Sequence, residues 1–141
     1  MIILDTDCLS LFEREKHLEF SILRANLAHF DSDDISTTII TYEEQMRGWM
    51  AYLAKCKNLE QQIFAYQRLF QSLENFREIN VLQFDEDAAK VFQDLKSQKI
   101  RIGTMDLKIA SIAISRKAIL VSRNLKDFEA VPNLVVNDWT R

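Results

Sequence analysis

Short apolar runs alternate along this chain with longer segments in which apolar residues recur every three or four positions. A short apolar run is typical of a buried strand, and the three-and-four spacing is typical of a helix with one buried face. Strands are therefore predicted over residues 1–4, from 35, over 79–84, over 119–122 and at 135–136. Helices are predicted around residues 9–12 and over 19–30, 37–58, 60–76, 86–97 and 105–116.

The helices predicted over 37–58 and 60–76 follow each other directly, which indicates a long helical hairpin. The second of them carries an aromatic stripe, formed by Phe64, Tyr66, Phe70 and Phe76. Such a stripe more often belongs to a core or to a dimer interface than to a cofactor site. We therefore expect these rings to be covered by the protein itself or by a second copy.

Two polar residues stand where a predicted helix begins. Asp85 is expected to cap the helix over 86–97, and Thr104 is expected to cap the helix over 105–116. Side chains of this type accept a hydrogen bond from a free backbone N–H in the first helical turn.

Strands separated by helices predict an α/β sandwich with a mostly parallel central sheet. The chain has 141 residues, a length that fits one domain spanning residues 1–141. In such sheets the ligand site lies at the carboxyl ends of the strands. Acidic residues just after a strand, or early in a neighbouring helix, are therefore the candidates for a functional site.

Four acidic residues occupy such positions. Asp5 directly follows the first strand, and Asp127 lies five residues after the strand over 119–122. Asp106 and Glu44 each lie early in a predicted helix. Each also has a purely structural interpretation: Asp5 as a helix cap, Asp106 as a partner of the helix dipole, Glu44 as the end of a capping box with Thr41, and Asp127 as a loop acid.

Carboxylates gathered in one pocket repel each other, and a bound divalent cation relieves that repulsion. A site made only of oxygen ligands favours Mg²⁺ or Mn²⁺ over Zn²⁺. Such a metal can activate water and stabilise the charge that develops on a phosphodiester. His17, His29, Cys8 and Cys56 follow no metal-ligand or nucleophile spacing, so a zinc site or covalent catalysis is not expected.

The formal net charge of −3 is unevenly distributed along the chain. Residues 1–90 hold nine Lys and Arg against sixteen Asp and Glu, whereas residues 91–141 hold nine against five. A basic C-terminal third can attract phosphates even in an acidic protein. On charge alone, a solvated charged surface is the simpler interpretation.

No stretch approaches the roughly 20 apolar residues that a membrane span needs. The N-terminus has neither the basic region nor the apolar region of a signal peptide. We therefore expect a cytoplasmic protein without a membrane partner.

Four segments, in this order, resemble the motifs of the PIN-domain ribonucleases, and within them of the VapC-type toxins of bacterial toxin–antitoxin pairs. They are IILDTDCLSLF, TTIITYEEQMRG, IGTMDLKIASIAI and ILVSRNLKDFEAVPNLVVNDW. In the second motif of that family a Glu precedes a Gly by four residues, which selects Glu44 over Glu43 because Gly48 follows. The chain departs from the family pattern at Asp7, where many members have Asn, and at Gln45, where Leu is common.

The resemblance implies a PIN-like three-layer α/β/α sandwich with a helical hairpin. It implies that Asp5 and Asp106 are the core ligands of Mg²⁺ or Mn²⁺, and that Glu44 and Asp127 complete the acidic site. By the same resemblance Thr6 and Thr104 hydrogen-bond the neighbouring acids, and Asn124 positions a substrate phosphate or a ligand carboxylate. Candidates for contacts to the RNA backbone are Lys108, Arg116, Lys117, Arg123 and Lys126.

The resemblance also implies partners. Members of the family typically form homodimers and are held inactive by a VapB-like antitoxin, whose C-terminal segment occupies the active-site groove. The hairpin over 50–76 is the natural place for that contact. The implied substrate is RNA, often tRNA or another structured RNA.

Two alternatives remain open from the sequence. The segment IILDTD also resembles the start of a haloacid-dehalogenase-like phosphatase, with Asp5 as nucleophile and Asp7 as acid/base, but Cys8-Leu9 replaces the Gly-Thr of that family and no late Asp pair follows. The second alternative is a non-catalytic PIN-like module that binds RNA or a protein. A binding module has no need to gather mutually repelling carboxylates, which argues against it.

Overall fold

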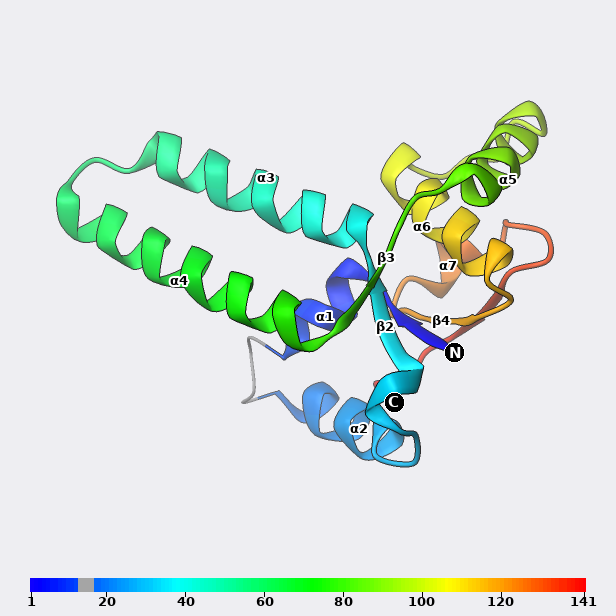
Figure 1. Cartoon of the computed structure of the whole chain (residues 1–141), viewed down its shortest axis with the longest axis horizontal. Helices are drawn as coiled ribbons and strands as arrows, with labels where there is room; N and C mark the ends of the chain where they lie inside the picture. The colour runs from blue at the N-terminus through cyan, green and yellow to red at the C-terminus, as the bar shows by residue number, and fades with distance from the viewer. Residues whose placement is uncertain (13–16) are drawn as a thin grey trace.

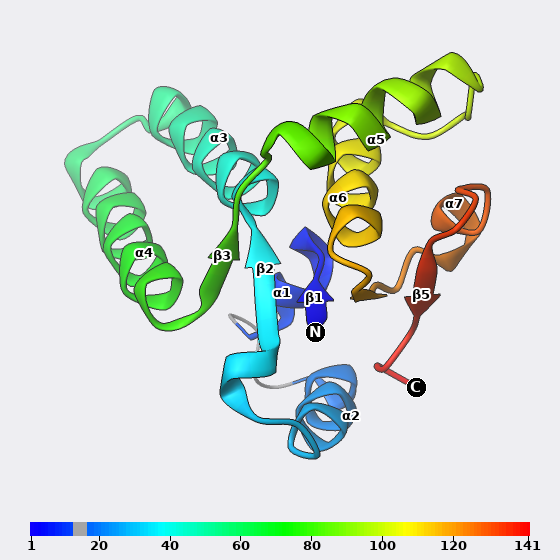
Figure 2. The same ribbon diagram turned by 45° about the vertical axis from the view of Figure 1, so that its right-hand side comes forward.

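A parallel β-sheet lies at the centre of the computed structural model, which describes residues 1–12 and 17–141 (Figures 1 and 2). The sheet has five strands in the order β3-β2-β1-β4-β5, and every neighbouring pair is parallel. The strands are β1 (Ile2–Leu4), β2 (Ile35–Thr38), β3 (Asn80–Leu82), β4 (Ile119–Val121) and β5 (Val135–Asn137). The predicted α/β sandwich with a mostly parallel sheet is confirmed.

Helices connect these strands and cover both faces of the sheet. In the described part of the chain they are α1 (Thr6–Leu11), α2 (Leu18–Leu27), the short 3₁₀ helix η1 (Ser32–Asp34), α3 (Ile39–Lys55), α4 (Leu59–Glu78), α5 (Glu86–Ser97), α6 (Thr104–Ser115) and α7 (Leu125–Phe128). None of them combines the length and apolar character that a membrane span requires. Most predicted elements are present with boundaries shifted by at most three residues, as helix and strand ends usually are.

The start of α3 differs from the prediction. Thr37 and Thr38 belong to β2, and the Thr37 hydroxyl donates to the backbone oxygen of Leu4 on the neighbouring strand at 2.9 Å. Thr38 is the N-cap, because its side chain accepts from the Thr41 amide at 3.1 Å. The predicted capping box between Thr41 and Glu44 is therefore wrong, which leaves Glu44 free for another role.

Two other local predictions have different outcomes. The Asp85 cap of α5 is confirmed, since its carboxylate accepts from the Ala88 amide at 3.0 Å. The Thr104 cap is wrong, because Gly103 occupies the cap position and Thr104 is the first residue of α6. The sequence predicts no element for the four-residue helix α7, because it is too short to display a helical period.

The two faces of the sheet bury different sets of side chains, as the alternation of a pleated strand requires. Ile3 and Leu120 pack into a cluster with α5, α6 and Phe128 of α7. Ile2, Leu4 and Val121 pack into a second cluster on the other face, with α1 and α2. The predicted three-layer arrangement is therefore present, with one helical layer on each face.

Helices α3 and α4 form the predicted hairpin, which extends away from the sheet (Figure 1). The aromatic residues of α4 do not all lie in a core. Phe76 is buried, whereas Phe64, Tyr66 and Phe70 are 44%, 59% and 64% exposed. The core interpretation is wrong for these three rings, and coverage by a second chain stays a prediction.

Because all strands run in the same direction, the carboxyl ends of β1, β2 and β4 lie at one edge of the sheet. Asp5 follows β1, α3 follows β2, and Ser122 follows β4 at that edge. This arrangement directs the candidate acidic residues toward a common region.

Lys117 provides a test of the backbone geometry, because it adopts a positive φ of 54° directly after the end of α6. Glycine tolerates this conformation without the steric cost that an L side chain has there. We expect Lys117→Gly to raise the free energy of unfolding by roughly 0.5 to 1 kcal/mol. Lys90→Gly, inside α5, should lower it by about 1 kcal/mol. Urea unfolding of both variants checks the contrast, and a loss of stability in both would contradict it.

Candidate active site

Asp5 lies at the centre of the carboxyl edge of the sheet and is only 5% exposed. Its carboxylate accepts a hydrogen bond from the Cys8 amide at 2.8 Å and thereby caps α1. The cap interpretation and the site interpretation of Asp5 are thus compatible, since one oxygen suffices for the cap. Burial raises the pKa of Asp5, while hydrogen bonds from Ser122 and from the Cys8 amide act in the opposite direction.

Glu44 reaches the same region from α3. The Thr6 hydroxyl lies 2.6 Å from Glu44 Oε1 and 3.2 Å from the Thr41 hydroxyl. Because a hydroxyl has one proton, we infer that Thr6 donates to the carboxylate and accepts from Thr41. Glu43 instead pairs with Arg47 at 2.5 Å along α3. The structure thus separates the two neighbouring glutamates and places Glu44 beside the first turn of α1.

Asp106 shows that the predicted acids face one another. It lies in the first turn of α6, and its pKa is raised to about 6 by burial and then by the charges of Glu44, Asp5 and Asp127. A carboxylate feels such repulsion only from charges that lie near it. Glu44, Asp5 and Asp127, which come from three other parts of the fold, therefore lie near enough to Asp106 to repel its charge.

Asp127 is the outermost of the four acids. It is exposed on α7 and accepts a hydrogen bond from the Asn124 side-chain amide at 3.0 Å. The Asn124 backbone amide in turn donates to the Ser122 hydroxyl at 2.9 Å. Asn124 and Asp127 form one polar unit at the rim of the site, so they are not competing candidates for one position.

The donor atoms suit a hard divalent cation, because all four side chains offer carboxylate oxygens. Among the described residues, no group of three or more acidic, histidine or cysteine side chains is arranged so that it could hold a metal ion. The raised pKa of Asp106 places the other carboxylates within range of electrostatic repulsion, but not within the shorter range that shared metal ligands require. The residues thus fit the predicted cation by chemistry, without forming a closed set of ligands.

The remaining predicted residues differ in their surroundings. Thr104 is exposed, and no hydrogen bond joins its hydroxyl to an acid within residues 1–12 and 17–141. Lys108 lies over the rings of Phe84 and Phe92, and Arg116 lies 3.7 Å from Asp85. Lys117 and Lys126 are exposed.

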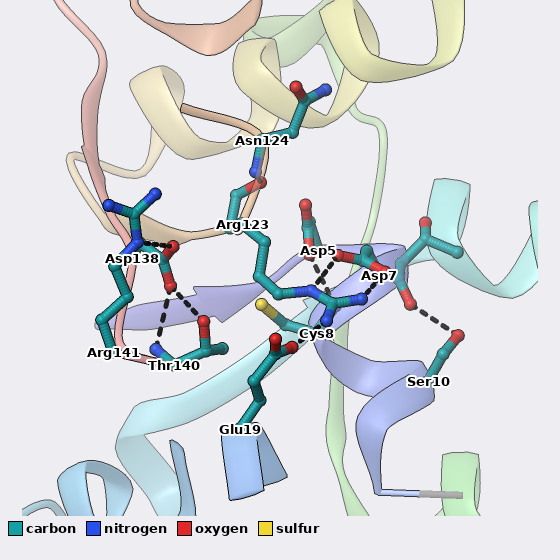
Figure 3. Close-up of polar contacts among 12 residues, drawn as sticks. Asp5, Asp7, Cys8, Ser10, Glu19, Arg123, Asn124, Asp138, Thr140 and Arg141 are labelled. Carbon is teal, nitrogen blue, oxygen red and sulfur yellow. Dashed lines mark hydrogen bonds and ion pairs between the residues drawn. The ribbon is translucent and has the colours of Figure 1, made fainter. Parts of the chain in front are cut away.

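Arg123 is paired within the protein. Its guanidinium is bound by the carboxylates of Asp7 and Glu19, as the dashed lines in Figure 3 indicate. An RNA phosphate would have to compete with these two carboxylates, so the RNA contact of Arg123 stays a prediction. Sequence reasoning also missed Ser122, because the predicted strand over 119–122 included it, whereas β4 ends at Val121.

Comparison with known proteins agrees with this geometry. The family model described as PIN domain matches residues 2–134. The chain belongs to the PIN domain family. Ribonuclease VapC1 of Haemophilus influenzae strain R2866 is 32% identical over 114 residues, covering 78% of each chain. The tRNA(fMet)-specific endonuclease VapC of Salmonella typhimurium is 32% identical over 65 residues, covering 43% of this PIN domain and 49% of that relative.

A solved structure of VapBC-1 from nontypeable Haemophilus influenzae superposes on this PIN domain with a TM-score of 0.71. The two chains share 28% sequence identity, and the match covers 100% of both. The resemblance predicted from the four motifs is therefore confirmed. The phosphatase alternative loses its support, and its required free acid/base is also missing, because Asp7 is paired with Arg123.

Asp106 allows a test of the electrostatic cost of the site. A folded-state pKa of about 6, above the ordinary value of 3.8, means that the folded protein binds the proton more tightly than the unfolded chain. Stability without metal should therefore fall as the pH rises from about 4 to about 6. We expect Asp106→Asn to raise the free energy of unfolding at pH 7.5 by roughly 1 to 3 kcal/mol, and to have little effect at pH 3.5.

Denaturant unfolding of the metal-free protein at the two pH values measures this difference. Asp94→Asn, which removes an exposed acid from α5, serves as the control for the change in net charge. An equal effect of Asp106→Asn at both pH values would contradict the repulsion between Asp106 and the other acids.

Proposed function

We propose that this PIN domain is a Mg²⁺- or Mn²⁺-dependent endoribonuclease and the toxin of a VapBC-type toxin–antitoxin pair. The observation that carries the proposal is the position of Asp5 and Glu44 at the carboxyl edge of the parallel sheet, where Thr6, the residue after Asp5, is hydrogen-bonded to Glu44. The raised pKa of Asp106 agrees with this arrangement, because its causes include the charges of Glu44, Asp5 and Asp127. A protein that only binds RNA would gain nothing from concentrating negative charge at this edge. The VapC relatives, which are named ribonucleases and endonucleases, support the same function.

In this proposal Asp5 and Asp106 bind the cation, and Glu44 and Asp127 complete the acidic site. When bound, the cation supplies an activated water and stabilises negative charge on the phosphodiester. The cap formed with the Cys8 amide fixes the orientation of Asp5. Thr6 fixes Glu44 from α1, so that two acids from different elements keep their relative positions.

The rim of the site is suited to hold the substrate. Asn124 can donate to a phosphate oxygen if Asp127 turns to the cation, because the two side chains are joined by a single hydrogen bond. Lys126, exposed on α7 beside Asp127, is a candidate for an RNA phosphate. The tRNA(fMet)-specific relative makes tRNA the first substrate to test.

The hairpin supports the proposed partners. Leu59, Ile63, Tyr66, Phe70 and Leu73 recur at alternating intervals of four and three along α4, and each is about half exposed or more. A helix with such a stripe packs well against a second helix. We infer that a partner covers this stripe, either the antitoxin or a second copy of the chain.

Substitution of the acidic residues tests the proposed site, and Glu43 on α3 provides a matched control for Glu44. Asp5→Asn, Asp106→Asn and Glu44→Gln should each lower tRNA cleavage in Mn²⁺ by at least about 100-fold, because each removes a charge that faces the cation. Glu43→Gln should retain the parent rate, since its side chain pairs with Arg47. Cleavage by purified Asp106→Asn at the parent rate would refute the assignment.

A titration with Mn²⁺ separates the nuclease from a non-catalytic module. The parent should gain thermal stability with increasing Mn²⁺, because binding to the folded state alone stabilises it. Asp5→Asn should gain much less. A parent without Mn²⁺-dependent stabilisation would favour the non-catalytic module.

The hairpin is tested by a charge placed on its exposed stripe. Phe70→Asp should leave RNA cleavage unchanged, because Phe70 is exposed on α4, which carries none of the four acids, but it should abolish binding of the partner that covers the stripe. Gel filtration with and without the co-expressed antitoxin shows which partner is lost. Gln71→Asp, an exposed polar position of the same helix, is the control. Unchanged assembly of Phe70→Asp with both partners would exclude the stripe as an interface.

A further inference from the structure

Three consecutive residues at the start of α1 contact three different parts of the candidate site. The Asp5 backbone amide donates to the backbone oxygen of Val121 at the end of β4 at 3.2 Å, and Thr6 donates to Glu44 on α3. Asp7 pairs with Arg123 in the segment between β4 and α7. The proposed function uses Asp5 and Thr6 and assigns no role to Asp7.

The pair of Asp7 and Arg123 has the geometry of a specific contact. Arg123 Nε and one terminal nitrogen each lie 2.6 Å from a different oxygen of the Asp7 carboxylate. The other terminal nitrogen of Arg123 bonds to Glu19 at the start of α2. A fork of two parallel hydrogen bonds fixes direction as well as distance, which a single ion pair does not. Arg123 therefore joins the segment between β4 and α7 to α1 and α2.

The segment that Arg123 anchors carries the rim of the site. Ser122 precedes it and Asn124 follows it, and these two residues are hydrogen-bonded to each other. The side chains of Arg123 and Asn124 point in opposite directions from the segment in Figure 3. Arg123 thus points to α1 and α2, while Asn124 holds Asp127 at the rim.

We propose that Arg123 is a positioning residue, which fixes Ser122, Asn124 and Asp127 relative to Asp5 through its fork on Asp7. This inference rests on the proposed function, because the side chains that it positions are those of the proposed nuclease site. It also assigns a role to Asp7, which is the partner of Arg123 and not a further member of the acidic site.

A contribution to overall stability does not explain the contact. Arg123 is 30% exposed, and its two partners are 46% and 48% exposed. Ion pairs with such exposure typically contribute little to stability, because water screens them and the side chains lose freedom. Stability therefore does not account for the two parallel hydrogen bonds that Arg123 donates to Asp7 at the edge of the site.

A double-mutant cycle tests the proposal. Arg123→Gln and Asp7→Asn should each lower the kcat for tRNA cleavage in Mn²⁺ roughly 10-fold, with KM changed by no more than about twofold. The double variant should be no slower than either single variant, because both remove the same contact. Arg123→Lys should recover only part of the loss, since an ammonium cannot form the fork. Arg77→Gln, an exposed arginine on α4, is the control for charge.

Additive losses in the double variant, or a rise in KM with kcat unchanged, would overturn the proposal and indicate a direct contact of Arg123 with RNA. A parent enzyme that cleaves no RNA would instead refute the proposed function. Hydrogen–deuterium exchange of the metal-free protein tests the contact independently of activity. Arg123→Gln and Asp7→Asn should both accelerate exchange over residues 122–128, whereas Arg77→Gln should not. Unchanged exchange in both variants would also overturn the proposal.

Discussion

The hydrogen bond from the Cys8 amide to the Asp5 carboxylate is the contact on which the rest of the site depends. It turns the chain from the buried strand β1 into α1 and holds the Asp5 side chain at the carboxyl edge of the sheet. Thr6 and Asp7 then lie in the first turn of α1, where they contact α3 and the segment after β4. One helix cap thereby sets the geometry of residues that are distant in the sequence.

This arrangement has an electrostatic cost. Asp106 is surrounded by three other acids and half-buried, and its pKa of about 6 reflects both effects. Folding concentrates charge at the very edge where neutral or paired side chains would be more stable. Proteins retain such local instability where a site has to bind a ligand of opposite charge, and a divalent cation is the ligand that we propose for this site.

The α3–α4 hairpin has a second feature that does not favour stability. Its outer surface exposes a continuous apolar stripe, although burial of such residues is the main driving force of folding. This PIN domain therefore has two surfaces that stability alone does not explain. In our proposal the acidic edge acts on RNA, and the hairpin binds another chain.

The sequence alone determined the order of strands and helices, the parallel sheet, the Asp85 cap and the four candidate acids, because these follow from hydrophobic period and local chemistry. Only the tertiary structure decided where β2 ends, because Thr37 bonds to Leu4 on another strand. It alone decided that Phe64, Tyr66 and Phe70 stay exposed, since periodicity does not reveal what covers a helix face. It also decided the partner of Arg123, because no local pattern links a residue to carboxylates more than a hundred positions away.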